Sequence, residues 1–330
     1  MSLLNINDLH CYFDTKRGLI RAVDGVTLSI DYGKTLGVVG ESGSGKSQTA
    51  LSILKLFEKN QRIFDGEVLL EGNNISNLKD TDMYNIRGNQ VSMIFQEPMT
   101  SLNPVFTIGR QICEVLFLHQ GLKKEQAYER SIELLESVKI HNPQKMIKQY
   151  PHQLSGGMRQ RVMIAMALAC NPKLLIADEP TTALDVTIQA QILSLMNELK
   201  EKLNTAIMFI THDLGVINRM ADDVAVMYCG QVVETAPVDF IFKPVTEYSH
   251  PYTEALLISI PKLSTKQGDR LDAIPGAVPH PLALPSGCRF APRCKYATDL
   301  CNDKMPDLVE VNSKQSVRCH YPKKGVRSNG

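Results

Sequence analysis

The sequence predicts an α/β fold with a mostly parallel sheet. Short apolar runs typical of buried strands alternate with stretches of helical periodicity, and three such runs are Thr35–Val39, Lys173–Ala177 and Ala206–Ile210. A glycine-rich segment follows the first run and two acidic residues follow the second. In parallel sheets, ligands bind at the carboxyl ends of the strands, so these segments are candidate sites. A chain of 330 residues can form one large core and a smaller appendage.

The first 33 residues are expected to form short antiparallel strands. Apolar and polar residues alternate there, and three glycines interrupt the pattern. The run at 66–72 is predicted to join the same layer. An aromatic side chain at Tyr12 or Phe13 could stack on a base, and a cross-strand aromatic pair explains the same pattern equally well.

The segment at 40–47 matches G-x-x-x-x-G-K-[ST] between a predicted strand and a predicted helix. In such a segment the glycines let the backbone turn tightly, so that its N–H groups meet phosphate oxygens. The lysine reaches the β- and γ-phosphates, and the serine hydroxyl can hold Mg²⁺. A chance Gly/Ser turn is the alternative, and a match over eight consecutive positions between a strand and a helix argues against it. The segment therefore predicts binding of a nucleoside triphosphate by Gly40, Glu41, Ser42, Gly43, Ser44, Gly45, Lys46 and Ser47.

The middle of the chain is predicted to be mainly helical. A strand at 91–95 is followed by turn residues and then by helices at 109–119 and 124–140. Leu154, Ser155, Gly156 and Gly157 precede a long helix at 159–170, which Pro172 ends. This helical block, between two regions that contain strands, indicates an inserted subdomain over about 97–160.

The strand that follows ends in two acids with chemically different tasks. Asp178 is suited to hold Mg²⁺, and Glu179 is placed to polarise the water that attacks the γ-phosphate. Asp185 is expected to cap the next helix. The run at 206–210 then delivers His212, which alone would be an ordinary histidine at the end of a strand.

The composition changes after Thr235. A hairpin around Gly230 precedes this point, and frequent prolines follow it. One short helix is predicted at 252–259, and the segment 236–330 is interpreted as an irregular appendage.

The chain resembles an ATP-binding cassette over 1–235. The segment at 40–47, Gln96, the Leu-Ser-Gly-Gly segment at 154–157, the acids at 178–179 and His212 occur in the family's order and approximate spacing. The resemblance extends over 236–330 to the ATP-binding subunits of oligopeptide and dipeptide permeases, through the segment at 250–253 and the terminal cysteines. It implies a P-loop NTPase core of the RecA-like type with an antiparallel β layer, the helical subdomain and the C-terminal appendage.

The resemblance also implies a mechanism in which two cassettes face each other head to tail. Each ATP then lies between the segment 40–47 of one subunit and the Leu-Ser-Gly-Gly segment of the facing subunit, which consists of Leu154, Ser155, Gly156 and Gly157. Asp185 lies in the adjoining loop. Glu179 and His212 take the catalytic roles, and Ser47, Gln96 and Asp178 serve Mg²⁺. Gln48 and Gln96 join the ATP site, and Phe13 is the aromatic residue that stacks on adenine. Met158 stands where the family usually has glutamine.

Four cysteines crowd into the last seventh of the chain: Cys288, Cys294, Cys301 and Cys319. Four thiolates suffice for a tetrahedral zinc ion or an iron–sulfur cluster, and the spacing lacks the close pairs of a zinc ribbon. The resemblance implies a [4Fe–4S] cluster, with zinc as the alternative and four unligated thiols as the simplest interpretation.

Composition restricts the partners. With 36 basic and 35 acidic residues, the chain gives no reason to expect nucleic-acid binding. No apolar run is long enough to span a membrane, and the N-terminus does not have the pattern of a signal peptide. The resemblance implies a second, related ATPase subunit, two transmembrane permease subunits and, indirectly, an extracytoplasmic peptide-binding protein. It places the chain peripherally on the cytoplasmic face of the inner membrane, as the ATPase of a peptide importer, with dipeptides preferred and longer peptides as the alternative. A soluble cassette ATPase acting on ribosomes or DNA is the competing hypothesis, and a redox-sensing appendage is a third.

Overall fold

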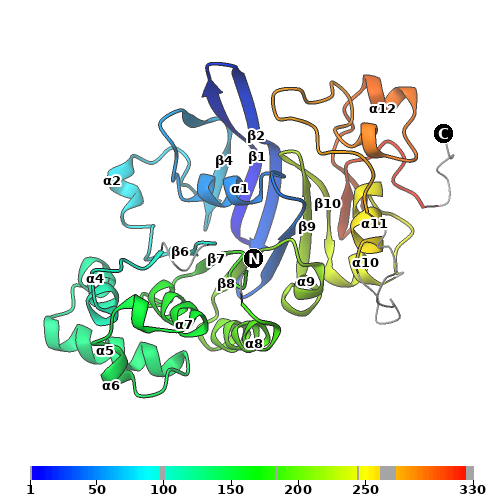
Figure 1. The fold of residues 1–330 in the computed structure, drawn as a ribbon. Helices are drawn as coiled ribbons and strands as arrows, with labels where there is room; N and C mark the ends of the chain where they lie inside the picture. Colours follow the sequence, from blue (N-terminus) through cyan, green and yellow to red (C-terminus); the bar gives the residue numbers. More distant parts are fainter. Residues whose placement is uncertain (1, 97–100, 183, 244, 261–272, 325–330) are drawn as a thin grey trace. The chain divides into compact units, whose positions relative to one another are not determined.

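The structure, a computed structural model, describes residues 2–96, 101–182, 184–243, 245–260 and 273–324. It consists of two compact units. The first unit comprises Met1–Leu3, Ile30–Thr35 and Asn77–Phe209, and the second comprises Leu4–Ser29, Leu36–Ser76 and Ile210–Gly330. The predicted start of the helical subdomain at 97–100 and Ala183 beside the Asp185 motif lie outside the described residues. Figure 1 shows the elements of both units.

The first unit contains a parallel sheet and a group of helices. Its strands are hydrogen-bonded in the order β8-β7-β6, and β6 and β7 pair in parallel from Val91↔Leu174 to Ile94↔Ala177. All five residues of β7 are buried, as the apolar run predicts. The strands are β6 (Val91–Ile94), β7 (Leu174–Asp178) and β8 (Ala206–Ile210).

The helices of this unit follow the predicted order. Figure 1 shows α4, α5, α6 and α7 gathered in one group, and their buried faces include Ile112, Leu135 and Ile164. The helices are α2 (Asp80–Met83), α4 (Ile108–Gln120), α5 (Lys124–Ser137), α6 (Pro143–Met146), the 3₁₀ turn η1 (Pro151–Gln153), α7 (Gly156–Ala167) and α8 (Val186–Leu203). The subdomain limits of about 97–160 stay a prediction.

The second unit contains a mixed sheet with the strand order β11-β12-β10-β9-β3. Strands β3 and β9 pair in parallel from Leu36↔Asp223 to Val39↔Val226, and β9 and β10 form the predicted hairpin. The two residues of its turn, Cys229 and Gly230, both have positive φ, as a tight hairpin turn requires. The strands are β3 (Thr35–Val39), β9 (Asp223–Tyr228), β10 (Gln231–Pro237), β11 (Val309–Asn312) and β12 (Gln315–Val317).

An antiparallel sheet of order β2-β1-β4-β5 also belongs to the second unit. The prediction of several short strands in the first 33 residues is wrong, because β1 (Ser2–Thr15) and β2 (Gly18–Asp31) are 14 residues long each. Gly25 lies inside β2 with a φ of 73° and does not end it. Strand β4 (Gln61–Leu70) pairs with β1 from Leu4↔Leu70 to Phe13↔Gln61, and β5 (Asn73–Asn74) lies at the edge.

The C-terminal region is more regular than the sequence predicts. Strand β12 pairs with β10 at Glu234↔Val317 and Thr235↔Ser316, so this region extends the sheet by two strands. Val317 is fully buried there, and the prolines that suggested irregular structure lie outside the two strands. The domain boundary after Thr235 falls within β10 and stays a prediction. The helices of the second unit are α1 (Lys46–Ile53), α9 (Leu214–Met220), α10 (Val238–Phe242), α11 (Pro251–Ile258), η2 (Ala291–Arg293) and α12 (Asp299–Asp303).

Within the part of the chain that the structure describes, none of the helices has the length and apolar composition that a membrane crossing requires.

Candidate nucleotide-binding site

The phosphate loop, residues 40–47, joins the buried strand β3 to helix α1 in the second unit. A Cβ atom at Gly40 would lie 2.2 Å from the carbonyl oxygen of Met227. At Gly45, where φ is 100°, it would lie 2.5 Å from the carbonyl oxygen of Ala22. Both positions therefore require glycine, which is the physical reason for two of the three glycines of the motif.

Helix α1 presents its N-terminus to the loop. Gly45 occupies the N-cap position and provides no side-chain cap, and the first turn carries no acidic residue. Backbone N–H groups in such a turn suit an anion. Lys46 is buried, and its Nζ donates to the carbonyl oxygens of Gly40 at 2.7 Å and Glu41 at 3.0 Å. The loop therefore holds the ammonium group close to its own turn.

The candidate aromatic residues on β1 have different surroundings. The Tyr12 hydroxyl donates to Asp24, and its ring packs on Phe64 with centroids 4.8 Å apart. Phe13 is half-buried, and as the next residue of the strand it points to the opposite face. Gln48, predicted at the ATP site, accepts a hydrogen bond of 2.9 Å from Gln61 of β4.

His212 follows strand β8 and is exposed. The N–H of Thr211 donates to the carbonyl oxygen of Val38 at 3.2 Å, so this segment is bound to the strand that leads into the phosphate loop. Asp213 caps helix α9 by accepting from the N–H groups of Gly215 at 2.8 Å and Val216 at 3.2 Å. Both ends of the His212 segment are thereby fixed.

In the first unit, the structure brings Gln96 and Glu179 together. Gln96 Nε2 donates to Glu179 Oε2 at 3.2 Å, and Thr182 Oγ1 donates to the same oxygen at 2.8 Å. Asp178 is the last residue of β7 and is buried. Glu179 has a φ of 47°, a conformation that costs a non-glycine residue energy and that concentrates at functional sites.

The Leu-Ser-Gly-Gly segment begins helix α7. Leu154 is buried, while Ser155 and Gly156 are exposed. Ser155 is the N-cap, and its hydroxyl accepts from the N–H of Met158 at 3.4 Å. Since Met158 contributes only its backbone to this cap, the departure from glutamine does not alter it. A Cβ at Gly157 would lie 2.9 Å from Ile188 Cγ2, so this glycine lets α7 and α8 pack closely. Asp185 caps α8 as predicted, with its carboxylate 3.0 Å from the N–H of Ile188.

The four C-terminal cysteines line one small cavity of about 20 Å³ in the second unit. Cys288 and Cys301 are joined through their backbones by a hydrogen bond of 2.7 Å. Burial raises the pKa of the Cys288 thiol. Among the described residues, no three His, Cys, Asp or Glu side chains are arranged to hold a single metal ion. Cys288, Cys294, Cys301 and Cys319 all line this one cavity, so the four thiols that lie close together in the sequence are also neighbours in the structure.

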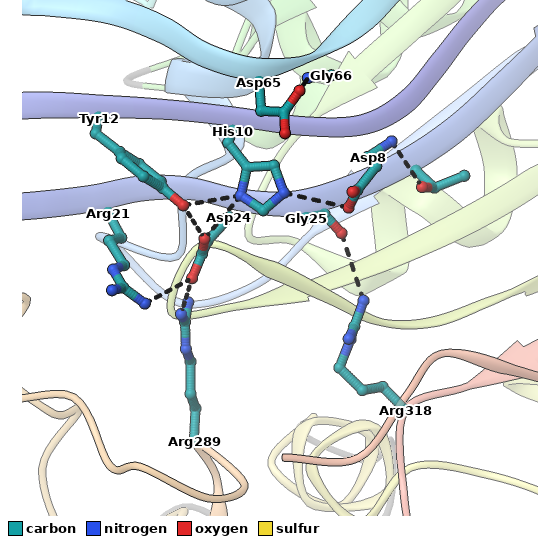
Figure 2. A network of polar contacts seen from close by, with 11 residues as sticks. Asp8, His10, Tyr12, Arg21, Asp24, Gly25, Asp65, Gly66, Arg289 and Arg318 are labelled. Carbon is teal, nitrogen blue, oxygen red and sulfur yellow. Dashed lines mark hydrogen bonds and ion pairs between the residues drawn. The ribbon is translucent and has the colours of Figure 1, made fainter.

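Two arginines beside these cysteines make contacts that the sequence analysis missed. Arg293 pairs with Glu41 of the phosphate loop, and Arg289 pairs with Asp24 of β2. Figure 2 shows Arg289 and Arg318 reaching from the C-terminal region toward β1 and β2, where Arg289 meets the carboxylate of Asp24. These partners are more than 200 residues apart, and no periodicity or local motif signals such pairs.

Comparisons with known proteins agree with this geometry. The ABC transporter family model matches residues 23–182, and the model of the oligopeptide/dipeptide transporter C-terminal region matches residues 233–301. The chain is 56% identical over 330 residues to the oligopeptide transport ATP-binding protein AppD of Bacillus subtilis, with 99% of each chain covered. This chain belongs to the ABC transporter family. A second relative in the family, the oligopeptide transport ATP-binding protein OppD of Salmonella typhimurium, is 51% identical, with 97% of this chain and 94% of OppD covered.

A solved ABC transporter cassette supports the same assignment. The dimeric post-hydrolysis state of the ATP-binding cassette MJ0796, bound to ADP and Pi, is similar with a TM-score of 0.64 and 28% identity. The match covers 71% of this chain and 98% of MJ0796. The chain therefore has the fold of an ABC ATPase, as the phosphate loop and the Leu-Ser-Gly-Gly segment predicted.

Proposed function

We propose that this ABC ATPase is the ATP-hydrolysing subunit of a peptide importer. The observation that carries the proposal is the phosphate loop, where Lys46 and the uncapped N-terminus of α1 surround the turn that two obligatory glycines form. The relatives are named oligopeptide transport proteins, which supports peptides as the transported class. These names favour oligopeptides over the dipeptides that the sequence analysis preferred.

The proposed roles follow the chemistry of each side chain. The N–H groups of the loop and Lys46 bind the phosphates of ATP, with Gln48 beside them and Phe13 against the adenine. Ser47, Gln96 and Asp178 offer the oxygen ligands that Mg²⁺ prefers, and the ion neutralises charge on the phosphates. Glu179 orients and deprotonates the attacking water, and His212 contacts the γ-phosphate of ATP. The hydrogen bond from Gln96 to Glu179 supports a shared task for these two residues.

The proposed assembly contains two cassettes. The exposed Ser155 and Gly156, at the N-terminus of α7, bind the γ-phosphate of ATP held by a facing, related subunit, with Leu154 and Gly157 supporting this end. ATP then joins the two subunits and its hydrolysis releases them, which drives two transmembrane permease subunits between conformations. An extracytoplasmic peptide-binding protein delivers the substrate. In this assembly the chain lies peripherally on the cytoplasmic face of the membrane.

We further propose that the four cysteines hold a [4Fe–4S] cluster, with zinc as the alternative. The cavity that the four side chains line supports this site. Anaerobic purification followed by iron, sulfide and zinc analysis distinguishes the two ligands. In Cys288→Ser, a purely structural cluster predicts loss of folding or assembly, whereas a redox sensor predicts an ATPase rate that depends on the redox state.

Co-purification with the membrane subunits and an ATPase assay with added peptide test the proposal. We expect the chain to assemble with the permease subunits and peptide, delivered by the binding protein, to stimulate the ATPase rate. Assembly with ribosomes or DNA and no response to peptide would favour a soluble cassette ATPase and contradict the proposal.

A further inference from the structure

Arg293 and Glu41 form a two-point ion pair within the second unit. Nη1 of Arg293 lies 2.7 Å from Oε2 of Glu41, and Nη2 lies 3.1 Å from Oε1. The arginine side chain is only 3% exposed and the glutamate side chain 29%. Paired hydrogen bonds of this kind fix the orientation of both partners as well as their distance.

Arg293 is itself held in place from three sides. Its Nε donates to the carbonyl oxygen of Pro275 at 2.9 Å, and Nη1 also donates to the Tyr228 hydroxyl at 3.3 Å. The guanidinium group is therefore a fixed positive charge and not a flexible surface cation.

The backbone of Glu41 is held by the same part of the chain. Its N–H donates to the Tyr252 hydroxyl at 2.8 Å, and Tyr252 is fully buried on α11. The ring of Tyr252 packs on Tyr228 and Phe290, with centroids 4.7 and 5.4 Å away. Both the side chain and the main chain of one residue of the phosphate loop are thus attached to the C-terminal region.

Glu41 has a direct connection to the groups that meet phosphate. Its carbonyl oxygen accepts from Lys46 Nζ at 3.0 Å and from the N–H of Ser44 at 3.2 Å. Its carboxylate is also a negative charge inside a loop whose ligand is a polyanion. Without a compensating cation, that charge would repel the triphosphate.

We propose that Arg293 is a positioning residue for nucleotide binding, which sets the affinity of the phosphate loop for MgATP by neutralising and orienting Glu41. The inference rests on the proposed function, since it assumes that the loop binds ATP. It assigns a second task to the segment 288–294, whose last residue, Cys294, follows Arg293 directly and lines the cysteine cavity. The C-terminal region thereby sets the affinity for nucleotide, although it lies outside the phosphate loop that contacts the nucleotide.

The test compares four variants by two measurements. Titration with a fluorescent ATP analogue in the presence of Mg²⁺ gives the nucleotide affinity, and the ATPase assay of the assembled transporter gives KM and kcat. Arg293→Met is expected to weaken nucleotide binding about tenfold, with kcat nearly unchanged, because an uncompensated charge lies beside the phosphates. Arg293→Lys keeps the charge without the two-point geometry and is expected to lie between Met and wild type. Glu41→Gln alone is expected to bind as tightly as wild type or more tightly. The double variant Glu41→Gln/Arg293→Met is expected to recover most of the lost affinity.

Recovery in the double variant separates this role from a merely structural one, because a folding defect would not be repaired by removing a second partner. Lys323→Met is the matched control, since it breaks an exposed ion pair of the same region, with Glu247 at 2.9 Å, and should leave binding unchanged. Equal affinity of Arg293→Met and wild type, or no recovery in the double variant, would overturn the inference. Should Arg293→Met fail to fold, Arg293→Lys and Glu41→Gln replace it in the test. Arg293→Lys is expected to weaken nucleotide binding, and Glu41→Gln is expected to leave it unchanged or strengthen it. Failure of the wild-type protein to bind nucleotide would instead contradict the proposed function.

Discussion

Arg289 and Asp24 form a buried ion pair that joins residues 265 positions apart in the sequence. The side chains are 5% and 10% exposed. Asp24 also accepts from the Tyr12 hydroxyl and contacts His10 Nδ1 at 2.9 Å (Figure 2). Arg289 donates in addition to the carbonyl oxygen of Cys229. The pair attaches the segment that begins at Cys288 to the antiparallel sheet of the same unit.

Loss of one partner of this pair should destabilise the protein strongly. Arg289→Met leaves the buried carboxylate of Asp24 with only the longer ion pair to the exposed Arg21 at 3.9 Å, and we expect a loss of about 3–5 kcal/mol in the free energy of unfolding. The double variant Asp24→Asn/Arg289→Met should lose less free energy of unfolding than Arg289→Met alone. Urea denaturation measures both, with Arg130→Met as the control, because the exposed Arg130–Glu133 pair should contribute less than about 1 kcal/mol. Equal losses in Arg289→Met and the control would refute this assignment.

The same site predicts a pH dependence. Burial raises the pKa of Asp24, but the hydrogen bond from Tyr12 and the charge of Arg289 outweigh burial and hold it below the ordinary value of 3.8. An acid with a lowered pKa in the folded state binds fewer protons there than in the unfolded chain. Its stabilising contribution is therefore fully present at pH values well above 3.8, and it is lost as the pH falls past 3.8 and through the lowered pKa.

We expect the difference in the free energy of unfolding between Asp24 and Asp24→Asn proteins to be constant above about pH 5 and to shrink below pH 3.8. Both proteins carry His10→Gln, so that the imidazole that contacts Asp24 is absent from both. Urea denaturation at each pH gives the difference, and a change between pH 8 and pH 6 would count against the prediction.

Gly45 should not tolerate a side chain. Its φ is 100°, and an added Cβ would lie 2.5 Å from the carbonyl oxygen of Ala22, so alanine would be both strained and crowded there. We expect Gly45→Ala to weaken ATP binding by at least about tenfold, because the loop must move away from its phosphate-binding form. Gly72→Ala is the matched control, since its φ is 80° but its Cβ would meet no atom within 4 Å. Unchanged affinity in Gly45→Ala would show that the loop does not need this conformation.

Asp185 has two separable roles. As the N-cap of α8 it accepts from Ile188, and Asp185→Ala should cost about 1 kcal/mol of stability. Asparagine caps equally well, so Asp185→Asn should keep the melting temperature. If the carboxylate also acts at the facing cassette, Asp185→Asn should still lower the ATPase rate of the assembled transporter. An unchanged rate would assign the residue to capping alone.

Much of the parallel core could be predicted because its signals are local. The run Ala206–Ile210 forms β8 with the predicted bounds, since its apolar residues are buried and its neighbours are polar. Ser155 and Asp185 begin α7 and α8 because their side chains replace missing backbone hydrogen-bond partners. The phosphate loop is visible for a related reason, as its glycines, lysine and serine stand at fixed positions within eight consecutive residues.

The remaining features depend on contacts that the local sequence does not encode. Gly25 has a φ that usually ends a strand, yet β2 continues through it. The pairing of β12 with β10 joins segments about 80 residues apart, so proline content alone suggested irregular structure. Glu179 adopts a positive φ that no residue pattern signals. The Arg293–Glu41 pair, separated by 252 positions, is visible only once the chain is folded.

The central claim is that ATP bound at the phosphate loop is hydrolysed through Glu179. The most direct measurement compares MgATP affinity and turnover of wild type and Glu179→Gln in the assembled transporter. We expect Glu179→Gln to bind ATP as tightly as wild type, to lose turnover by about 10²- to 10⁴-fold, and to accumulate cassette dimers that retain nucleotide. Turnover that persists in Glu179→Gln, or nucleotide that fails to bind to the wild-type protein, would contradict the account.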